Sequence, residues 1–267
     1  MLSALVPWQP VWPLIALFAL VALCYARGFW RCGKAGDLPA ALSFGVGLVS
    51  MYVVMQTQFD YYARYMFFVH RAQHLVLHHL GPFLIALAMP SRLLAAGAPG
   101  WLLHGWRAVT GWKPVWFAYR IVQQPVVAGL LFVGLIGLWL TPVVHFGAML
   151  DIRRYWLMNL SMAVDGLLFW WMILDPRPPG ATAVTRGVGA RMLVLLAIMP
   201  PQIIIGAWIT FSPEVIYQVY AVCGRAWPVA PLVDQQLGGL ITWIPAAMMS
   251  VLATLVLLSM YFRQIRE

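Results

Sequence analysis

The sequence predicts an all-α polytopic membrane protein: one integral membrane helical domain, residues 1–267, folded as a bundle of seven transmembrane helices. Hydrophobic residues make up 63% of the chain and charged residues only 9%, whereas a soluble domain carries about 25% charged residues. Seven apolar stretches are also long enough to cross a bilayer, which takes about 20 residues per helix. No internal repeat divides the chain, so one bundle accounts for it.

The seven predicted helices cover residues 11–30, 38–57, 65–89, 121–146, 155–174, 188–211 and 237–262. The first follows no basic segment, so we expect a retained helix rather than a cleaved signal peptide. The long segment between the third and fourth helices combines tryptophans with basic residues, which is typical of amphipathic stretches at a membrane interface. Pro200 and Pro201 interrupt the sixth helix and are expected to kink it, because proline lacks a backbone donor.

The distribution of basic residues predicts the orientation. Twelve lie after the first, third, fifth and seventh predicted helices, and four lie on the other side: Arg64, Arg153, Arg154 and Arg225. Because cytoplasmic loops carry the excess of Lys and Arg, we expect the N-terminus to lie outside and the C-terminus to lie in the cytoplasm. The same rule explains the net charge of +9 without a nucleic-acid partner.

A stripe of histidines lies in the third predicted helix. His70, His74 and His78 are spaced i, i+4, i+8 and share one face of an α-helix, with Met66 one turn earlier. Neutral imidazoles at this spacing chelate transition metals, and a thioether beside them suits Cu(I). A histidine inside a membrane favours a functional role, and hydrogen bonding across helices is the alternative. His79 is expected to project from nearly the opposite face.

Other predicted helices bring histidine, methionine and polar side chains to the same outer half of the membrane. His145 lies near the outer end of the fourth helix, and residues 158–165 open the fifth. For the pair Met158 and Met162, core packing is the favoured interpretation, and a Cu(I) relay is the alternative. The candidate metal ligands are His70, His74, His78, His145, Met66, Met149, Met158 and Met162, and the candidate residues that orient them are Asp165, Asp234, Gln73 and Asn159.

Asp165 is the only acidic residue well inside a predicted helix. A charge at the centre of a membrane helix costs roughly 2.5–3.5 kcal/mol on insertion scales, so we expect this carboxylate to be buried and not a surface charge. Four roles are open for this carboxyl group: it is neutral, it pairs with Arg71, it belongs to a proton relay, or it orients a histidine. We favour the partner role.

The sequence contains none of the common enzyme signatures: no G-x-S-x-G, Walker loop, H-E-x-x-H or C-x-x-C-H. We therefore expect a protein that is not an enzyme. The residues alone leave metal or haem open. A b-type cytochrome would hold haem between His145 and either His70 or His74, and a copper transporter would use the interrupted sixth helix.

Three blocks of the sequence resemble one family. The first, residues 69–75, reads Val-His-Arg-Ala-Gln-His-Leu and is followed by Gly81-Pro82 and Ala88-Met89-Pro90. The second covers residues 145–171 and ends in Gly-Leu-Leu-Phe-Trp-Trp. The third, residues 234–239, reads Asp-Gln-Gln-Leu-Gly-Gly and is followed by Trp243-Ile-Pro245. Over about residues 40–262 they resemble the multi-spanning CtaG-type cytochrome c oxidase assembly factors of bacteria.

This resemblance implies a role in maturing haem–copper oxidases by helping copper, as Cu(I), to reach the CuB centre. It implies the bacterial inner membrane as the location, it implies oxidase subunit I and a periplasmic copper donor as partners, and it leaves homo-oligomers open. By motif, His70, His74, His145 and Asp234 carry over. Many relatives have an acidic residue and a histidine before the second block's Trp-Trp pair, where this chain has residues 158–162, Met-Asn-Leu-Ser-Met. A ligand in those relatives is therefore replaced by methionine here or is missing.

Overall fold

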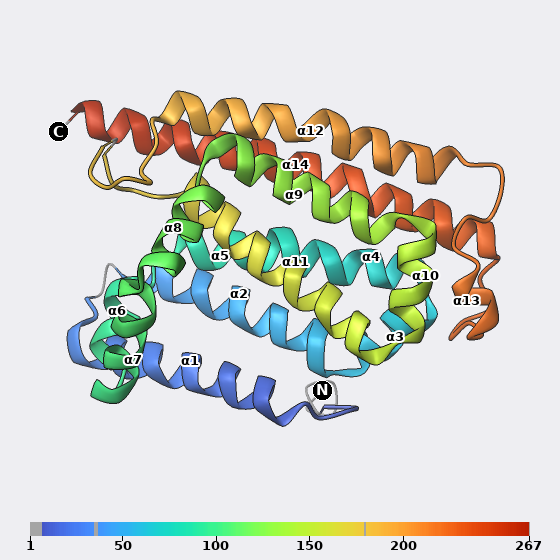
Figure 1. The fold of residues 1–267 in the computed structure, drawn as a ribbon, viewed down its shortest axis with the longest axis horizontal. Helices are drawn as coiled ribbons and strands as arrows, with labels where there is room; N and C mark the ends of the chain where they lie inside the picture. Colours follow the sequence, from blue (N-terminus) through green and yellow to red (C-terminus); the bar gives the residue numbers. More distant parts are fainter. Residues whose placement is uncertain (1–6, 35–36, 179, 267) are drawn as a thin grey trace.

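The computed structural model describes residues 7–34, 37–178 and 180–266, and all regular structure in these ranges is helical (Figure 1). In chain order the helices are α1 (Trp12–Cys32), α2 (Leu38–Gln56), α3 (Gln58–Tyr65), α4 (Phe67–Leu75), the π-helical turn η3 (Val76–Leu80), α5 (Gly81–Leu87), α6 (Ser91–Gly97), α7 (Gly100–Gly111), α8 (Lys113–Val122), α9 (Pro125–Leu140), α10 (Pro142–Leu150), α11 (Ile152–Ile173), α12 (Val188–Phe211), α13 (Val219–Val222) and α14 (Pro231–Arg266).

Five of these helices, α1, α2, α11, α12 and α14, are long and apolar enough to cross a membrane. Two further spans are bent. The rod Phe67–Leu87 meets α6 at 77°, and α8 meets α9 at 79°. Counting each bent pair as one span gives up to seven. The predicted all-α membrane fold is confirmed, with seven as the upper end of this count.

The rod formed by α4, η3 and α5 lies at the centre of the bundle. It packs against α14, α2 and α11, while α12 and α9 lie along one side and α1 along the other (Figure 1). Gly238 and Gly239 of α14 permit this packing. A Cβ on Gly238 would lie 2.3 Å from the Phe67 ring of α4, and one on Gly239 would lie 2.4 Å from Thr210 Oγ1 of α12. These two glycines therefore allow α14 to approach both α4 and α12 closely.

Two of the predicted helices contain a break that the sequence prediction did not include. The third breaks at Met66, whose extended backbone (φ −137°, ψ 125°) separates α3 from α4. The fourth breaks at Thr141, because Pro142 lacks a backbone donor and disfavours helical backbone in the residue before it. In the sixth, by contrast, α12 continues through Pro200 and Pro201, so these prolines do not interrupt the helix.

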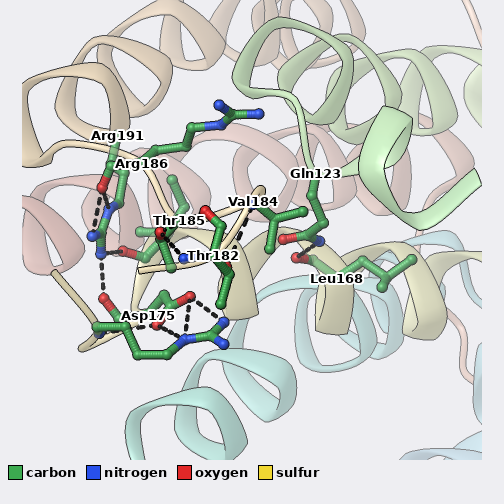
Figure 2. Close-up of polar contacts among 10 residues, drawn as sticks. Gln123, Leu168, Asp175, Thr182, Val184, Thr185, Arg186 and Arg191 are labelled. Carbon is green, nitrogen blue, oxygen red and sulfur yellow. Dashed lines mark hydrogen bonds and ion pairs between the residues drawn. The ribbon is translucent and has the colours of Figure 1, made fainter. Parts of the chain in front are cut away.

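The segment between α11 and α12 is tied down by Arg191, one turn into α12 (Figure 2). Its Nη1 donates to the carbonyls of Ile173 at 3.2 Å and Asp175 at 2.5 Å, and its Nε donates to the carbonyl of Arg186 at 2.9 Å. Asp175 also pairs with Arg177 at 2.6 Å. Burial raises the pKa of the Asp175 carboxyl, but the hydrogen bonds and charge of Arg177 outweigh burial and lower that pKa overall.

Helices α7 and α8 bury none of their residues against the described part of the chain. The side chains of Trp101, Trp106 and Trp112 are 69%, 67% and 63% exposed. Both helices lie at the end of the bundle where α14 ends, opposite α3, α10 and α13 (Figure 1). That these two helices are amphipathic and lie at a membrane interface stays a prediction.

Candidate metal-binding core

The central rod carries six polar residues in buried positions, and the turn η3 changes the course of this otherwise α-helical segment. In η3 the amide of Gly81 bonds to the carbonyl of Val76, five residues back. Helix α11 stabilises this turn: Trp170 Nε1 donates to the carbonyl of His78 at 3.0 Å. A Cβ on Gly166 would lie 2.5 Å from the same carbonyl oxygen, so only glycine allows α11 to approach this closely.

His70, His74 and His145 form the first histidine cluster. The ring of His70 lies 4.3 Å from that of His74 and 5.1 Å from that of His145, between centroids. His70 is 0% exposed, and neither of its ring nitrogens has a hydrogen-bond partner among the described residues. The structure therefore brings together the two helices that the sequence placed at one depth, around an imidazole with a free lone pair.

The neighbours of His74 and His145 determine which ring nitrogens carry protons. Arg71 Nη1 lies 3.3 Å from His74 Nδ1, and because guanidinium only donates, Nδ1 accepts and Nε2 donates to Asn159 Oδ1 at 3.1 Å. His145 Nδ1 donates to the carbonyl of Trp139 at 3.0 Å, so Nε2 accepts from the Tyr220 hydroxyl at 3.0 Å. Both histidines therefore have their lone pairs engaged by donors.

The candidate methionines fall into two groups. Met158 and Met162 of α11 are 0% and 1% exposed and pack in the cluster that contains Tyr217 and Tyr220, with Met149 partly buried against it. Met66 packs elsewhere, with Ala63 and Val69. The expectation that Met66 extends the histidine stripe is wrong in geometry, because the chain is extended at Met66 and the helix begins after it.

His78 and His79 form a second cluster around η3. Their rings are 5.1 Å apart, and both are buried, at 0% and 4% exposed. The expectation that His79 faces away from the stripe is therefore wrong. His78 Nε2 lies 2.9 Å from Asp165 Oδ2. Asp165 is thus a buried neighbour of a histidine. The alternative pairing with Arg71 is wrong, because Arg71 Nε donates to Thr242 Oγ1 at 2.9 Å.

Asp234 and Gln73 support the helix that carries the first cluster. The carboxylate of Asp234 accepts from the amides of Phe67 and Phe68, at 3.1 and 2.9 Å, and pairs with Arg225. It therefore satisfies the unpaired N–H groups at the start of α4. Gln73 Nε2 donates to Asp60 Oδ1 at 3.0 Å.

Asp60 is a buried polar residue that the sequence analysis missed. It is 1% exposed, accepts from the Tyr155 hydroxyl at 2.7 Å and pairs with Arg64 at 2.8 Å. A signal was present, since an acidic residue four positions before an arginine is a common helical ion pair.

The described residues contain no group of three or more His, Cys, Asp or Glu arranged to hold a metal ion. Space inside the core is also small. A cavity of about 10 Å³ lies between the two clusters, lined by Arg71, His74, His79, Met162 and Thr242 among others. Such a cavity has room for about one water molecule. A larger cavity of about 280 Å³ reaches His145 between α10 and residues 216–219.

The fold and the buried histidines define a polytopic α-helical membrane protein with a polar, imidazole-rich core. The family model described as cytochrome c oxidase caa3 assembly factor (Caa3_CtaG) matches residues 23–264. The chain therefore belongs to this family of cytochrome c oxidase assembly factors, and the resemblance drawn from the three sequence blocks is confirmed.

Three similar proteins come from mycobacteria, and each is described as uncharacterized. The one from Mycobacterium leprae is 26% identical over 284 residues, which covers 95% of this chain and 40% of the relative. Those from Mycobacterium bovis and Mycobacterium tuberculosis are each 27% identical over 272 residues, covering 93% of this chain and 38% of the relative. The chain thus spans about two-fifths of the length of these relatives. No solved structure matches.

Proposed function

We propose that this oxidase assembly factor acts without catalysis, by binding Cu(I) in the outer half of the membrane and passing it to the CuB centre of a haem–copper oxidase. One observation carries the proposal: the fully buried imidazole of His70, with both ring nitrogens unpartnered within the described residues, lies between two other imidazoles. A buried polar group without a partner costs free energy, and a bound Cu(I) ion would recover it.

His145 is the better second ligand for this copper. Its Nε2 lone pair is directed at the Tyr220 hydroxyl, a neutral donor that can turn away. The corresponding lone pair of His74 faces the guanidinium of Arg71, whose positive charge repels a cation. Coordination by two imidazoles would hold Cu(I) with few ligands and release it to a site with more, and Met162 lines a small cavity with His74 of the same cluster. Copper is the cargo of this site and not a resident cofactor.

The proposed route of transfer depends on the proposed orientation. When the side of the bundle that carries twelve basic residues faces the cytoplasm, the cluster of His70, His74 and His145 lies in the outer half of the bilayer. A periplasmic copper donor then loads it from outside, and oxidase subunit I receives the ion laterally. The nearby segment containing α13 and the cavity that reaches His145 lie on this loading side.

Cu(I) titration of the purified full chain tests the proposal. We expect the His70→Ala/His74→Ala double variant to lose a copper that wild type binds, whereas His104→Ala, at an exposed histidine of α7, retains it. A folded double variant with wild-type copper binding contradicts the proposal. A Soret band in the purified wild-type protein favours haem instead.

A second experiment measures the metal content of the oxidase purified from cells that lack this protein. We expect CuB to be depleted while oxidase subunits are still made. Normal CuB occupancy with activity lost for another reason, such as missing haem, refutes copper delivery. Copper uptake by vesicles that contain the protein alone favours a transporter.

A further inference from the structure

The second histidine cluster, at η3, has the chemistry of a binding site in its own right. The side chains of His78 and His79 are adjacent in sequence, yet both point into the bundle because of the π-helical turn. Turns of this kind inside α-helices are frequent at functional sites. The unpartnered atoms of this cluster are distinct from those of His70.

Asp165 prepares His78 to act as a ligand. The contact of 2.9 Å between His78 Nε2 and Asp165 Oδ2 places the proton on Nε2 when the carboxylate accepts it, which leaves the lone pair on Nδ1. That Nδ1 has no hydrogen-bond partner in the described part of the chain. Histidines that bind metals commonly donate their other N–H to a carboxylate, which fixes the tautomer and increases the basicity of the ligand nitrogen.

His79 and Gln202 supply further unpartnered atoms. Both ring nitrogens of His79, and both the oxygen and nitrogen of the Gln202 amide, lack hydrogen bonds to any described residue. Gln202 of α12 is 0% exposed and lies within hydrogen-bonding reach of the His79 ring, although the two side chains make no hydrogen bond of good geometry. Native proteins leave few buried polar atoms unsatisfied, and each one calls for an explanation such as an ion. Here five such atoms gather at one turn.

The surrounding charges favour a monovalent cation here. The carboxylate of Asp165, behind His78, offsets one positive charge. Arg71 donates to Thr242 and His74 and lines the same small cavity as His79, so its positive charge disfavours an ion of higher charge. A soft monovalent ion suits neutral imidazoles, and the aromatic rings of Phe132 and Trp170 pack against the two histidines and exclude water.

From this geometry we propose a second Cu(I) site, formed by His78 Nδ1 and His79 at the π-helical turn, with Gln202 beside it and Asp165 orienting His78. The choice of copper rests on the proposed function, since the site itself requires only a soft monovalent cation. His74 of the first cluster and His79 of the second line one small cavity, so the two proposed sites are neighbours in the core.

The test counts Cu(I) bound to the purified full chain in detergent, without oxygen and against a chromophoric chelator. Wild type is expected to bind two ions, His79→Leu one, and the His70→Ala/His74→Ala variant the other one. His104→Ala is the matched control and keeps both. X-ray absorption of the His70→Ala/His74→Ala variant with Cu(I) is expected to show imidazole nitrogens as ligands.

Two substitutions that keep the size of the side chain guard against misfolding. Asp165→Asn is expected to weaken one of the two sites by about 10–100-fold, as for other residues that orient a metal ligand. Gln202→Leu removes an amide that makes no hydrogen bond of good geometry with any described residue, so it is expected to retain wild-type thermal stability and to weaken the same site.

The outcomes separate this inference from the proposed function. Wild-type copper stoichiometry in folded His79→Leu, with unchanged affinities in Asp165→Asn and Gln202→Leu, overturns the second site and leaves the first intact. Loss of copper in His79→Leu combined with no loss in the His70→Ala/His74→Ala variant supports the second site and overturns the first. A wild-type chain that binds one ion, lost only with His70 and His74, also overturns the second site.

Discussion

Asp234 connects two distant parts of the chain, and its removal should destabilise the protein more than any surface change. Its carboxylate accepts from the amides of Phe67 and Phe68, 167 and 166 positions away, and pairs with Arg225. Asp234 is 0% exposed. Asp234→Ala therefore leaves two amides at the start of α4 and one largely buried guanidinium without their partner.

The size of the effect can be worked out from these contacts. Breaking a buried ion pair by removing one partner costs roughly 3–5 kcal/mol, and the orphaned amides contribute to a total near the upper end. A free-energy change of 1 kcal/mol shifts the melting temperature by about 2–4 °C for a domain of 150–250 residues. We therefore expect Asp234→Ala to melt about 10 °C or more below wild type.

The assay is thermal unfolding of the purified variants in one detergent, with the exposure of a buried cysteine as the readout. Asp151→Ala is the matched control. Asp151 also accepts from a helix-start amide, that of Arg153 at 2.8 Å, but it is partly exposed and its loss costs about 1 kcal/mol. Arg225→Gln tests the ion pair separately. If Asp234→Ala melts within about 2 °C of Asp151→Ala, less than the shift of a single kcal/mol, the carboxylate does not hold α4 and the reasoning fails.

Other contacts support three further predictions. Gly166→Ala should destabilise the protein by about 1–3 kcal/mol, because the new Cβ meets the backbone of His78; Gly134→Ala, where nothing lies within 4 Å, should not, and equal melting temperatures would contradict the close packing. The pKa of Asp175 is lowered in the folded protein, so its contribution to stability is present above the unfolded pKa and is lost as the pH falls through the folded pKa. The difference in melting temperature between wild type and Asp175→Asn should therefore shrink in acid. A difference that stays constant with pH would contradict this contribution of Asp175. In a Cys223→Ser background, Glu214→Cys should react with an impermeant reagent outside intact cells and Ala183→Cys should not; the reverse pattern would invert the proposed orientation.

The sequence was sufficient to predict most helices, because length and hydropathy alone mark a segment that crosses a membrane. It also predicted that α4 and α10 bring His70 and His145 together, since both lie at one depth. The break at Thr141 was predictable from Pro142, but the hydrophobic run continues across it and hid the signal.

The break at Met66 and the turn η3 were not predictable from local sequence. The start of α4 depends on Asp234 of α14, far along the chain. The π-helical turn depends on Trp170 and Gly166 of α11, which bond to and pack against the carbonyl of His78. A regular period of 3.6 residues therefore placed His79 on the wrong face. Tertiary contacts, and not propensity, decide these positions.

The turn η3 also bears on how this core can change over generations. Losing one codon from an ordinary α-helix rotates the residues before the gap by about 100° relative to the residues after it. A π-helical turn contains one residue more than the α-helix around it, so a single deletion within Val76–Leu80 would let the segment close as regular helix. Helices α4 and α5 would keep their phase, and the cluster of His70, His74 and His145 would persist. The pair at η3 is thus a feature that a lineage can gain or discard in one step without rebuilding the bundle.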